Sequence, residues 1–154
     1  MWRFMHASTF ANRYSGPMAD AMTTLVLLAF GGGLGSVLRA VLSGRVARYA
    51  HPAVGVFVVN LSGSFLIGCA WSALATMNGQ YDTIFQDFYF QIFALGVLGG
   101  YTTVSSFALQ TFELWQADRR GAAVFNSVGS VLACPGVAVF GAWVAAAVLG
   151  GGTP

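Results

Sequence analysis

"GGYTTVSSF", residues 99–107, lies inside an apolar run that extends over residues 88–115. It brings two Gly, two Thr and two Ser into a segment that is otherwise suited to hydrocarbon. The run exceeds the length of about 20 residues that a helix needs to cross a bilayer, so it has room for an irregular middle. Non-helical backbone at membrane depth is tolerated only where protein buries it or where it lines a water-filled cavity. These residues therefore predict a helix that is broken in mid-membrane.

A break of this kind has two interpretations. It frees backbone carbonyl groups, and their oxygens, together with Thr hydroxyls, suit the coordination of a small cation. Alternatively, it is a glycine kink in which Thr and Ser hydroxyls bond back to the helix and satisfy its backbone. The residue types are compatible with both a cation site and a glycine kink.

The composition of the whole chain is typical of a membrane protein. Of its 154 residues, 56% are hydrophobic and 8% are charged, whereas about a quarter of the residues in a soluble domain are charged. Four runs are long enough to cross a bilayer: residues 22–42, 54–77, 88–115 and 122–149. We therefore predict an all-α membrane protein with four transmembrane helices, of which the third is broken.

The predicted helices form one domain, residues 22–150. Residues 1–21 are expected to be a poorly ordered N-terminal tail, or to be translated upstream of the true start, because Met18 and Met22 follow. Residues 151–154 are expected to be a short C-terminal tail.

The positions of the charged residues exclude several classes of function. Arg39 is the one ionisable residue well inside a predicted span, and Glu113 lies close to the end of the third. A proton-coupled exporter needs a titratable group within the membrane, and Arg does not release its proton at physiological pH. No carboxylate pair, His-centred dyad or metal cluster supports an enzyme. The scattered net charge of +2 gives no reason to expect a nucleic-acid partner. Passive permeation and a purely structural role remain.

Two predicted helices carry polar or small residues at every fourth position: Asn60, Ser64 and Gly68, then Asn126, Ser130 and Cys134. Such a face allows close helix packing, or it lines a pore, and the spacing fits both. Arg39 either extends toward the lipid headgroups or attracts an anion to a pore mouth. Neutral donors such as amides and hydroxyls suit an anion better than a cation.

Four motifs, in order along residues 25–150, resemble those of the CrcB/Fluc family of fluoride channels. They are GGGLGSVLR at 31–39, VNLSGSFLIG at 59–68, GGYTTVSSF at 99–107, which is similar to the family pattern GGxTTFSxF, and the Asn126/Ser130 spacing. The resemblance implies that residues 22–150 are a fluoride-channel domain that assembles as an antiparallel, dual-topology dimer with two pores. It also implies a multi-pass protein of the bacterial inner or plasma membrane. There, passive fluoride efflux would lower cytoplasmic fluoride and confer fluoride resistance.

The same resemblance implies roles for individual residues. Gly99 and Thr102 would bind a structural Na⁺ that is not transported, at the centre of the dimer. Arg39 would lie at the vestibule. The fluoride pathway would contain Asn60, Phe107, Ser105, Ser106, Asn126 and Ser130.

Position 104 departs from the family pattern. Val104 stands where the pattern has a second Phe, so one of two aromatic ring edges that would meet fluoride is missing. Gln110 stands where the family often has Glu. We therefore expect altered conductance, or one compromised class of pore.

Three functions follow from these observations. The first is a fluoride channel, assembled as a homodimer. The second is a mainly structural subunit of a heterodimeric fluoride channel, with Val104 as a sign of relaxed constraint. The third is a small proton-coupled multidrug exporter, and the missing membrane carboxylate argues against it.

The arginines bear on the choice of partner. Four of them lie in the loops after the first and third spans: Arg45, Arg48, Arg119 and Arg120. The loop after the second span has none, and the N-terminal tail contains Arg3 and Arg13. Positively charged loops tend to stay in the cytoplasm, so this distribution favours one orientation unless the tail offsets it. A chain with one orientation would need an oppositely oriented partner to form an antiparallel dimer.

Overall fold

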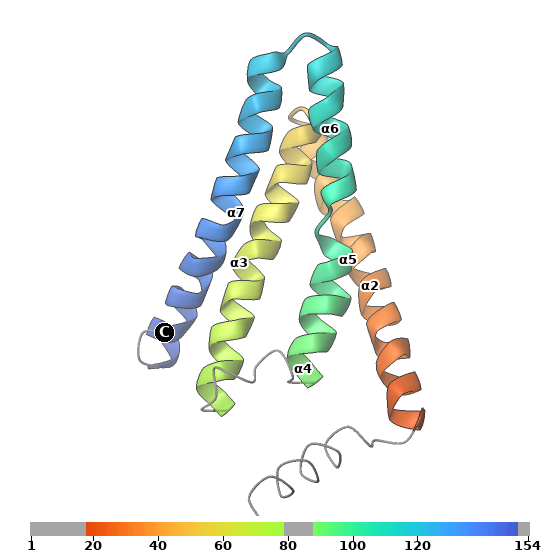
Figure 1. The fold of residues 1–154 in the computed structure, drawn as a ribbon, viewed down its shortest axis with the longest axis vertical. Coiled ribbons are helices and arrows are strands. Elements are labelled where there is room, and N and C mark those ends of the chain that lie inside the picture. The colour runs from red at the N-terminus through yellow and green to blue at the C-terminus, as the bar shows by residue number, and fades with distance from the viewer. Residues whose placement is uncertain (1–17, 79–87, 151–154) are drawn as a thin grey trace, which may run out of the picture.

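The computed structural model describes residues 18–78 and 88–150, and most of the predicted N-terminal tail and all of the C-terminal tail lie outside it. Its elements, in chain order, are α2 (Met18–Ala47), α3 (Pro52–Asn78), α4 (Phe88–Gln91), the π-helix η2 (Ile92–Leu98), α5 (Gly99–Tyr101), α6 (Val104–Gln116) and α7 (Arg120–Leu149) (Figure 1). Four spans are long and apolar enough to cross a membrane: Ala21–Ala47, Pro52–Thr76, Phe88–Gln116 and Arg120–Leu149. The predicted all-α architecture with four membrane-spanning helices is confirmed.

Helices α3 and α7 pack against each other more extensively than any other pair. Small residues allow this, because a Cβ at Gly68 would overlap the Ala138 carbonyl oxygen and a Cβ at Gly141 would overlap the Phe65 carbonyl oxygen. Backbones that approach this closely gain packing and short-range attraction, which drive helix association where lipid removes the hydrophobic contribution. For Gly68, the packing interpretation of the polar and small face on α3 is therefore confirmed.

The third span changes its neighbours at its centre. Its first half, η2 and α5, packs on α2, whereas its second half, α6, packs on α7 and α3 (Figure 1). The Gly-rich stretch of α2 makes the first contact possible. A Cβ at Gly35 would overlap the Val97 carbonyl oxygen, and a Cβ at Gly100 would overlap the carbonyl oxygen of Gly32. Ser36 Oγ also donates a hydrogen bond to the Gly100 carbonyl, at 3.3 Å.

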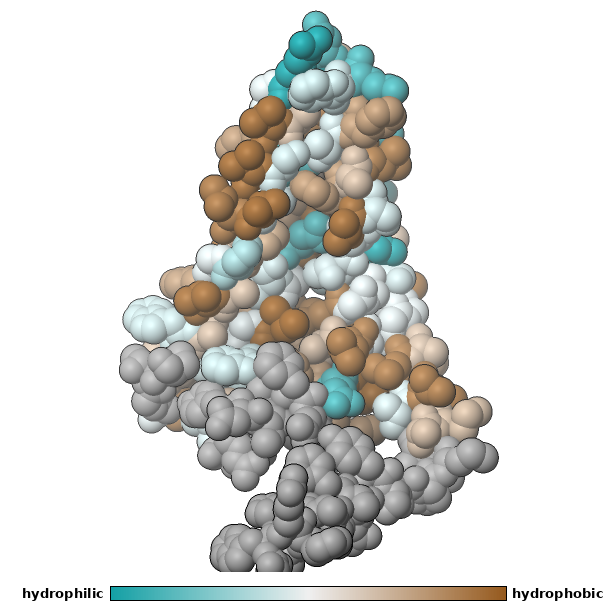
Figure 2. All heavy atoms as spheres, in the orientation of Figure 1, coloured by the Kyte–Doolittle hydropathy of each residue, from teal (hydrophilic) through white to brown (hydrophobic). Residues whose placement is uncertain are grey.

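Most large apolar side chains point away from the bundle. Phe30, Leu132 and Val148 are examples, with exposed fractions of 78%, 70% and 77%. In Figure 2 the flanks are largely hydrophobic, and hydrophilic residues gather at the end formed by the turn between α6 and α7. This surface is suited to lipid or to a partner subunit rather than to water.

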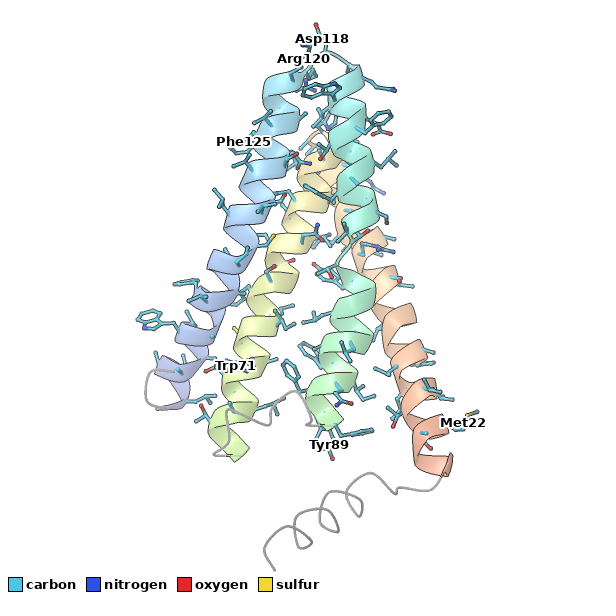
Figure 3. The ribbon with its side chains drawn as sticks, viewed as in Figure 1. Met22, Trp71, Tyr89, Asp118, Arg120 and Phe125 are labelled. Atoms are coloured by element: carbon cyan, nitrogen blue, oxygen red, sulfur yellow. The ribbon has the colours of Figure 1, made fainter. Side chains whose placement is uncertain are left out.

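The turn between α6 and α7 collects charged side chains at one end of the molecule. Arg120 Nε lies 3.0 Å from Asp118 Oδ1, and the Arg120 guanidinium stacks 5.5 Å from the centre of the Trp115 ring. Figure 3 shows Asp118 and Arg120 at this end, far from Tyr89. His51, from the loop after α2, and Arg119 line one cavity, so both arginine-bearing loops lie on the same side.

The contact between α2 and the third span gives a first prediction. Gly35→Ala should lower the thermal stability of the detergent-solubilised protein, because the new methyl group would meet the Val97 backbone, which cannot move aside without disturbing η2. Gly33→Ala is the matched control, since a Cβ at Gly33 has no neighbour within 4 Å. Equal unfolding temperatures for the two variants would contradict the proposed close packing.

Candidate functional site

The third span is interrupted by two residues in extended conformation. Helix α5 ends at Tyr101, Thr102 has φ −77° and ψ 160°, Thr103 has φ −154° and ψ 126°, and α6 begins at Val104. These angles belong to extended backbone rather than to a kinked helix. The predicted break is therefore confirmed, and it lies within the stretch 99–107.

The side chain of Asn60 holds the break from the neighbouring helix α3. Its Nδ2 donates to the Thr103 carbonyl at 3.0 Å, and its Oδ1 accepts from the Thr103 N–H at 2.9 Å. One amide thus satisfies both backbone groups of a residue that has left the helix. An unpartnered backbone group at this depth would cost several kcal/mol. The structure therefore assigns Asn60 a role that its sequence position did not reveal, as the clamp of the break.

Hydroxyl groups satisfy the helix ends on both sides of the break. Thr102 Oγ1 donates to the Leu98 carbonyl at 2.9 Å. Thr103 Oγ1 accepts from the Ser106 N–H at 3.2 Å, so Thr103 is the N-cap of α6. Hydroxyls that bond back to the helix were one of the two interpretations of this stretch, and these bonds are present. They accompany a full break rather than a kink.

The other interpretation, freed carbonyl groups, is also supported by the geometry. In a continuous helix the Gly99 carbonyl would accept from the Thr103 N–H, and the Thr102 carbonyl would accept from the Ser106 N–H. Both donors are engaged elsewhere, by Asn60 Oδ1 and by Thr103 Oγ1. Gly99 is exposed, and the nearest atom that a Cβ at this position would meet is the Ala94 carbonyl oxygen, at 3.7 Å. Two oxygens without their helical donors therefore remain beside the break.

The π-helix before the break was not predicted. Over residues 92–98 the helix widens, and the Gly99 N–H bonds to the Ala94 carbonyl, five residues earlier. Segments of this kind are often found at functional sites in helices. No residue type in IFALGVL indicates it, because the widened turn depends on how η2 packs against α2.

A first cavity lies at the break. It has a volume of about 500 Å³ and is lined by residues of α3, the third span and α7, among them Asn60, Gly99, Thr102, Thr103, Val104 and Cys134. Its lining contains no charged side chain among the described residues. Val104 is 80% exposed, so it faces outward from this subunit.

A second cavity lies at the arginine-bearing end. It has a volume of about 360 Å³, and its lining includes His51, Phe57, Leu114, Arg119, Phe125 and Asn126. Within the described part of the chain, Arg119 is the one fully charged residue of this lining. A cavity with a single positive charge at a helix end and an amide farther along α7 favours an anion.

The polar face of α7 extends from the second cavity to the first. Asn126 lines the second cavity, Cys134 lines the first, and Ser130 lies one helical turn from each. Ser130 is buried, and its Oγ has no hydrogen-bond partner in the described structure. A buried hydroxyl without a partner costs about 1–3 kcal/mol. Water or an ion between the cavities would remove this cost.

Helix α6 runs alongside this face. Val104 lies at the first cavity and Leu114 at the second, with Phe107 and Gln110 between them. Phe107 is half-buried, and Gln110 Oε1 is buried without a partner among the described residues. Along α6, one aromatic residue and two polar residues, Gln110 and Thr111, therefore lie between the residue at the first cavity and the residue at the second.

The other predicted site residues lie as follows. Ser105 Oγ and Ser106 Oγ are 3.1 and 3.2 Å from Thr103 Oγ1, so both belong to the hydroxyl cluster that caps α6. Arg39 is half-buried on α2 and lines neither cavity. Among the described residues, no group of three His, Cys, Asp or Glu side chains is placed to bind a metal ion.

Sequence patterns did not indicate a site role for four residues that the geometry places here: Thr103, Thr111, His51 and Arg119. The capping role of Thr103 had a signal, because Thr and Ser at the start of a helix after a break are typical N-caps. The other three are brought to the site by helix packing and carry no local signal.

The comparisons with known proteins agree with this architecture. A family model described as CrcB-like protein, Camphor Resistance (CrcB), matches residues 26–142. The chain belongs to the CrcB family. This CrcB chain is 44% identical over 112 residues to a protein of Brucella abortus named fluoride-specific ion channel FluC 4, and the match covers 71% of this chain and 81% of that protein.

Relatives from other organisms have similar names. A Rhodospirillum rubrum protein named fluoride-specific ion channel FluC is 41% identical over 124 residues, which are 79% of the CrcB chain and 90% of the relative. A Methanosarcina acetivorans protein named fluoride-specific ion channel FluC 1 is 33% identical over 112 residues, or 72% and 82% of the two chains. The resemblance drawn from the motifs is confirmed at the level of the family. With its four spans, the CrcB chain is a multi-pass membrane protein.

The clamp gives a second prediction. Asn60→Ala should lower the thermal stability of the CrcB protein, because it leaves the Thr103 N–H and carbonyl without partners, at about 1–3 kcal/mol for each group. Ser64→Ala, one turn along the same face of α3, is the matched control. Thermal unfolding in detergent would measure both. An unfolding temperature for Asn60→Ala equal to that of the control would show that the clamp does not stabilise the break.

Proposed function

We propose that this CrcB protein is a fluoride-selective channel that lowers cytoplasmic fluoride by passive efflux. The observation that carries the proposal is the polar face of α7, which extends from one cavity to the other; among the described residues, neither cavity lining contains a carboxylate. Asn126 and Ser130 supply an amide and a hydroxyl, and the Ser130 hydroxyl has no partner in the described structure. The names of the relatives supply the identity of the ion.

The chemistry of the pathway suits a small, strongly hydrated anion. Such an ion leaves water only where several donors replace its hydration shell, and one Arg does not suffice. Neither cavity lining contains Asp or Glu among the described residues, so a fluoride ion would meet no fixed negative charge there. Arg119 would attract the anion to the second cavity, and the narrow route of neutral donors would favour fluoride over the larger chloride.

Aromatic ring edges complete the proposed pathway. The edge of a Phe ring carries partial positive charge, and Phe107 lies on α6 between the two cavities. Val104, at the first cavity, has no ring to offer. We propose that Phe107 contacts fluoride, together with donors from Asn60, Ser105 and Ser106, and that conduction takes place without the second ring.

The break itself is the proposed Na⁺ site. The carbonyl oxygens of Gly99 and Thr102 have lost their helical donors, and unwound carbonyls are typical Na⁺ ligands in membrane proteins. One chain would supply only part of the coordination shell, so the equivalent oxygens of a second subunit would complete it. The ion would neutralise converging carbonyl dipoles and hold two antiparallel subunits together, and it would not be transported.

The distribution of the arginines raises an alternative to the homodimer, in which the second subunit is a different chain. The loop after α2 and the turn before α7, which carry or adjoin Arg45, Arg48, Arg119 and Arg120, lie at the same end, and this favours a single orientation of the chain in the membrane. In that case the chain would be one subunit of a heterodimer whose partner has the opposite bias. Efflux from liposomes that contain this chain alone would show that it conducts without a partner, because reconstitution does not impose the cellular orientation.

A proton-coupled exporter has less support. Glu113 on α6 and Asp118 in the following turn are exposed at the arginine-bearing end, and Asp20 belongs to the first turn of α2. Neither Glu113 nor Asp118 lines either cavity. Within the described residues, neither cavity therefore offers a carboxylate that could exchange a proton for a substrate.

The third prediction tests the pathway by fluoride efflux from liposomes that contain only this chain. Phe107→Ile should reduce efflux about tenfold or more, because it removes the remaining ring edge while roughly keeping the volume. Phe112→Ile is the matched control on the same helix, since Phe112 is 55% exposed and lines neither cavity. Val104→Phe should maintain or raise the flux.

Each result has a direct consequence. Normal efflux in Phe107→Ile would remove Phe107 from the pathway. No efflux from the unmodified chain, followed by efflux once an oppositely biased CrcB subunit is added, would favour the structural-subunit alternative.

The fourth prediction concerns the cation. Replacement of Na⁺ by N-methyl-D-glucamine on both sides of the membrane should abolish fluoride efflux and weaken the dimer, because a bulky organic cation does not fit among backbone carbonyls. Efflux and cross-linking of the dimer would be measured at graded Na⁺ concentrations. Full flux in rigorously Na⁺-free buffer would refute the proposed site.

A further inference from the structure

Thr111 and Asn126 form a hydrogen-bonded pair between α6 and α7. Asn126 Nδ2 lies 2.8 Å from Thr111 Oγ1, and Thr111 Oγ1 lies 2.9 Å from the Phe107 carbonyl oxygen. Asn126 is buried, with an exposed fraction of 8%, and it lines the second cavity. The pair therefore joins the polar face of α7 to the helix turn that bears Phe107.

The number of hydrogens in the pair fixes its direction. A Thr hydroxyl has one hydrogen, and Thr111 donates it to the Phe107 carbonyl. Thr111 Oγ1 can then only accept from Asn126, which requires the amide nitrogen, and not the amide oxygen, to face α6. An Asn side chain has two N–H groups, so one N–H remains after the bond to Thr111.

We propose that Thr111 is a positioning residue for anion permeation. It holds the Asn126 amide in one fixed orientation, in which one N–H bonds to Thr111 and the second N–H remains for an ion in the second cavity. Without Thr111 no bond to α6 fixes the amide, so its N–H is no longer held in place for the ion. The proposal rests on the fluoride-channel function and extends it, because Thr111 controls the selectivity of a donor without contacting the ion itself.

The experiment measures fluoride efflux and the fluoride-to-chloride permeability ratio in liposomes. Thr111→Val keeps the shape of the side chain but can neither accept nor donate. We expect efflux to fall about tenfold, because the anion loses one hydrogen bond from the Asn126 N–H, and hydrogen bonds to charged groups are worth about that much. The permeability ratio should fall as well. Thr111→Ser retains the hydroxyl and should therefore keep most of the efflux and most of the permeability ratio of the unmodified protein.

A matched control separates this role from helix stability. Ser127 Oγ bonds back to the Ala123 carbonyl at 2.9 Å, as Thr111 does to Phe107, but no bond from Ser127 to another helix accompanies it in the described structure. Ser127→Ala should therefore leave efflux and selectivity unchanged. Should Thr111→Val not yield folded protein, Thr111→Cys takes its place, because a thiol is a weak acceptor of similar size.

A double-mutant cycle decides whether Thr111 acts through Asn126. In an Asn126→Ala background, Thr111→Val should have no further effect on the permeability ratio, since the amide that it positions is gone. Equal effects of Thr111→Val in both backgrounds, or normal selectivity in Thr111→Val alone, would overturn the proposal while leaving the channel function intact. Absence of fluoride efflux from the unmodified protein, alone or paired with an oppositely biased subunit, would overturn both.

Discussion

The two-point hydrogen bond between the Asn60 amide and the Thr103 backbone is the interaction on which the rest of the structure depends. A bilayer offers no water to a peptide group that leaves its helix, so a broken span requires a partner for each exposed N–H and carbonyl. An Asn side chain carries a donor and an acceptor in one plane and can satisfy both groups of one residue. Because α3 provides that amide at mid-depth, the third span can end as one helix and begin again as another.

The same bonds distribute the remaining polar groups around the break. Asn60 accepts from the Thr103 N–H, and the Thr103 hydroxyl accepts from the Ser106 N–H. In a continuous helix these two N–H groups would have bonded to the Gly99 and Thr102 carbonyls, which therefore lack those donors. Carbonyl oxygens without their helical donors are therefore left beside the break, at Gly99 and Thr102, and the amide of Asn126 and the hydroxyl of Ser130 lie on α7. This arrangement is compatible with both the proposed cation site at the break and the proposed anion route along α7.

The sequence predicted those features that are determined locally. Hydropathy located the four spans, because lipid requires about 20 apolar residues for each. The excess of Gly, Thr and Ser at 99–107 located the break, since such residues are rarely consecutive in an uninterrupted span. The pairing of Thr111 with Asn126, the clamp at Thr103 and the approach of His51 to Arg119 could not be predicted. Each brings together residues that are far apart in the sequence, and their meeting depends on how the helices pack in the whole bundle.

The π-helix Ile92–Leu98 has a consequence for how the family varies in length. A π-turn is geometrically an α-helix that has received one additional residue, so this segment behaves as a built-in insertion. Loss of that residue would convert the segment to ordinary α-helix and leave Phe88–Gln91 and GGYTTVSSF in nearly the same rotation, because the extra residue is absorbed within the widened turns. Alignments of relatives should therefore tolerate a one-residue deletion within 92–98. The same deletion in the regular turns of α6 would instead rotate the residues on one side of it by about 100° relative to those on the other.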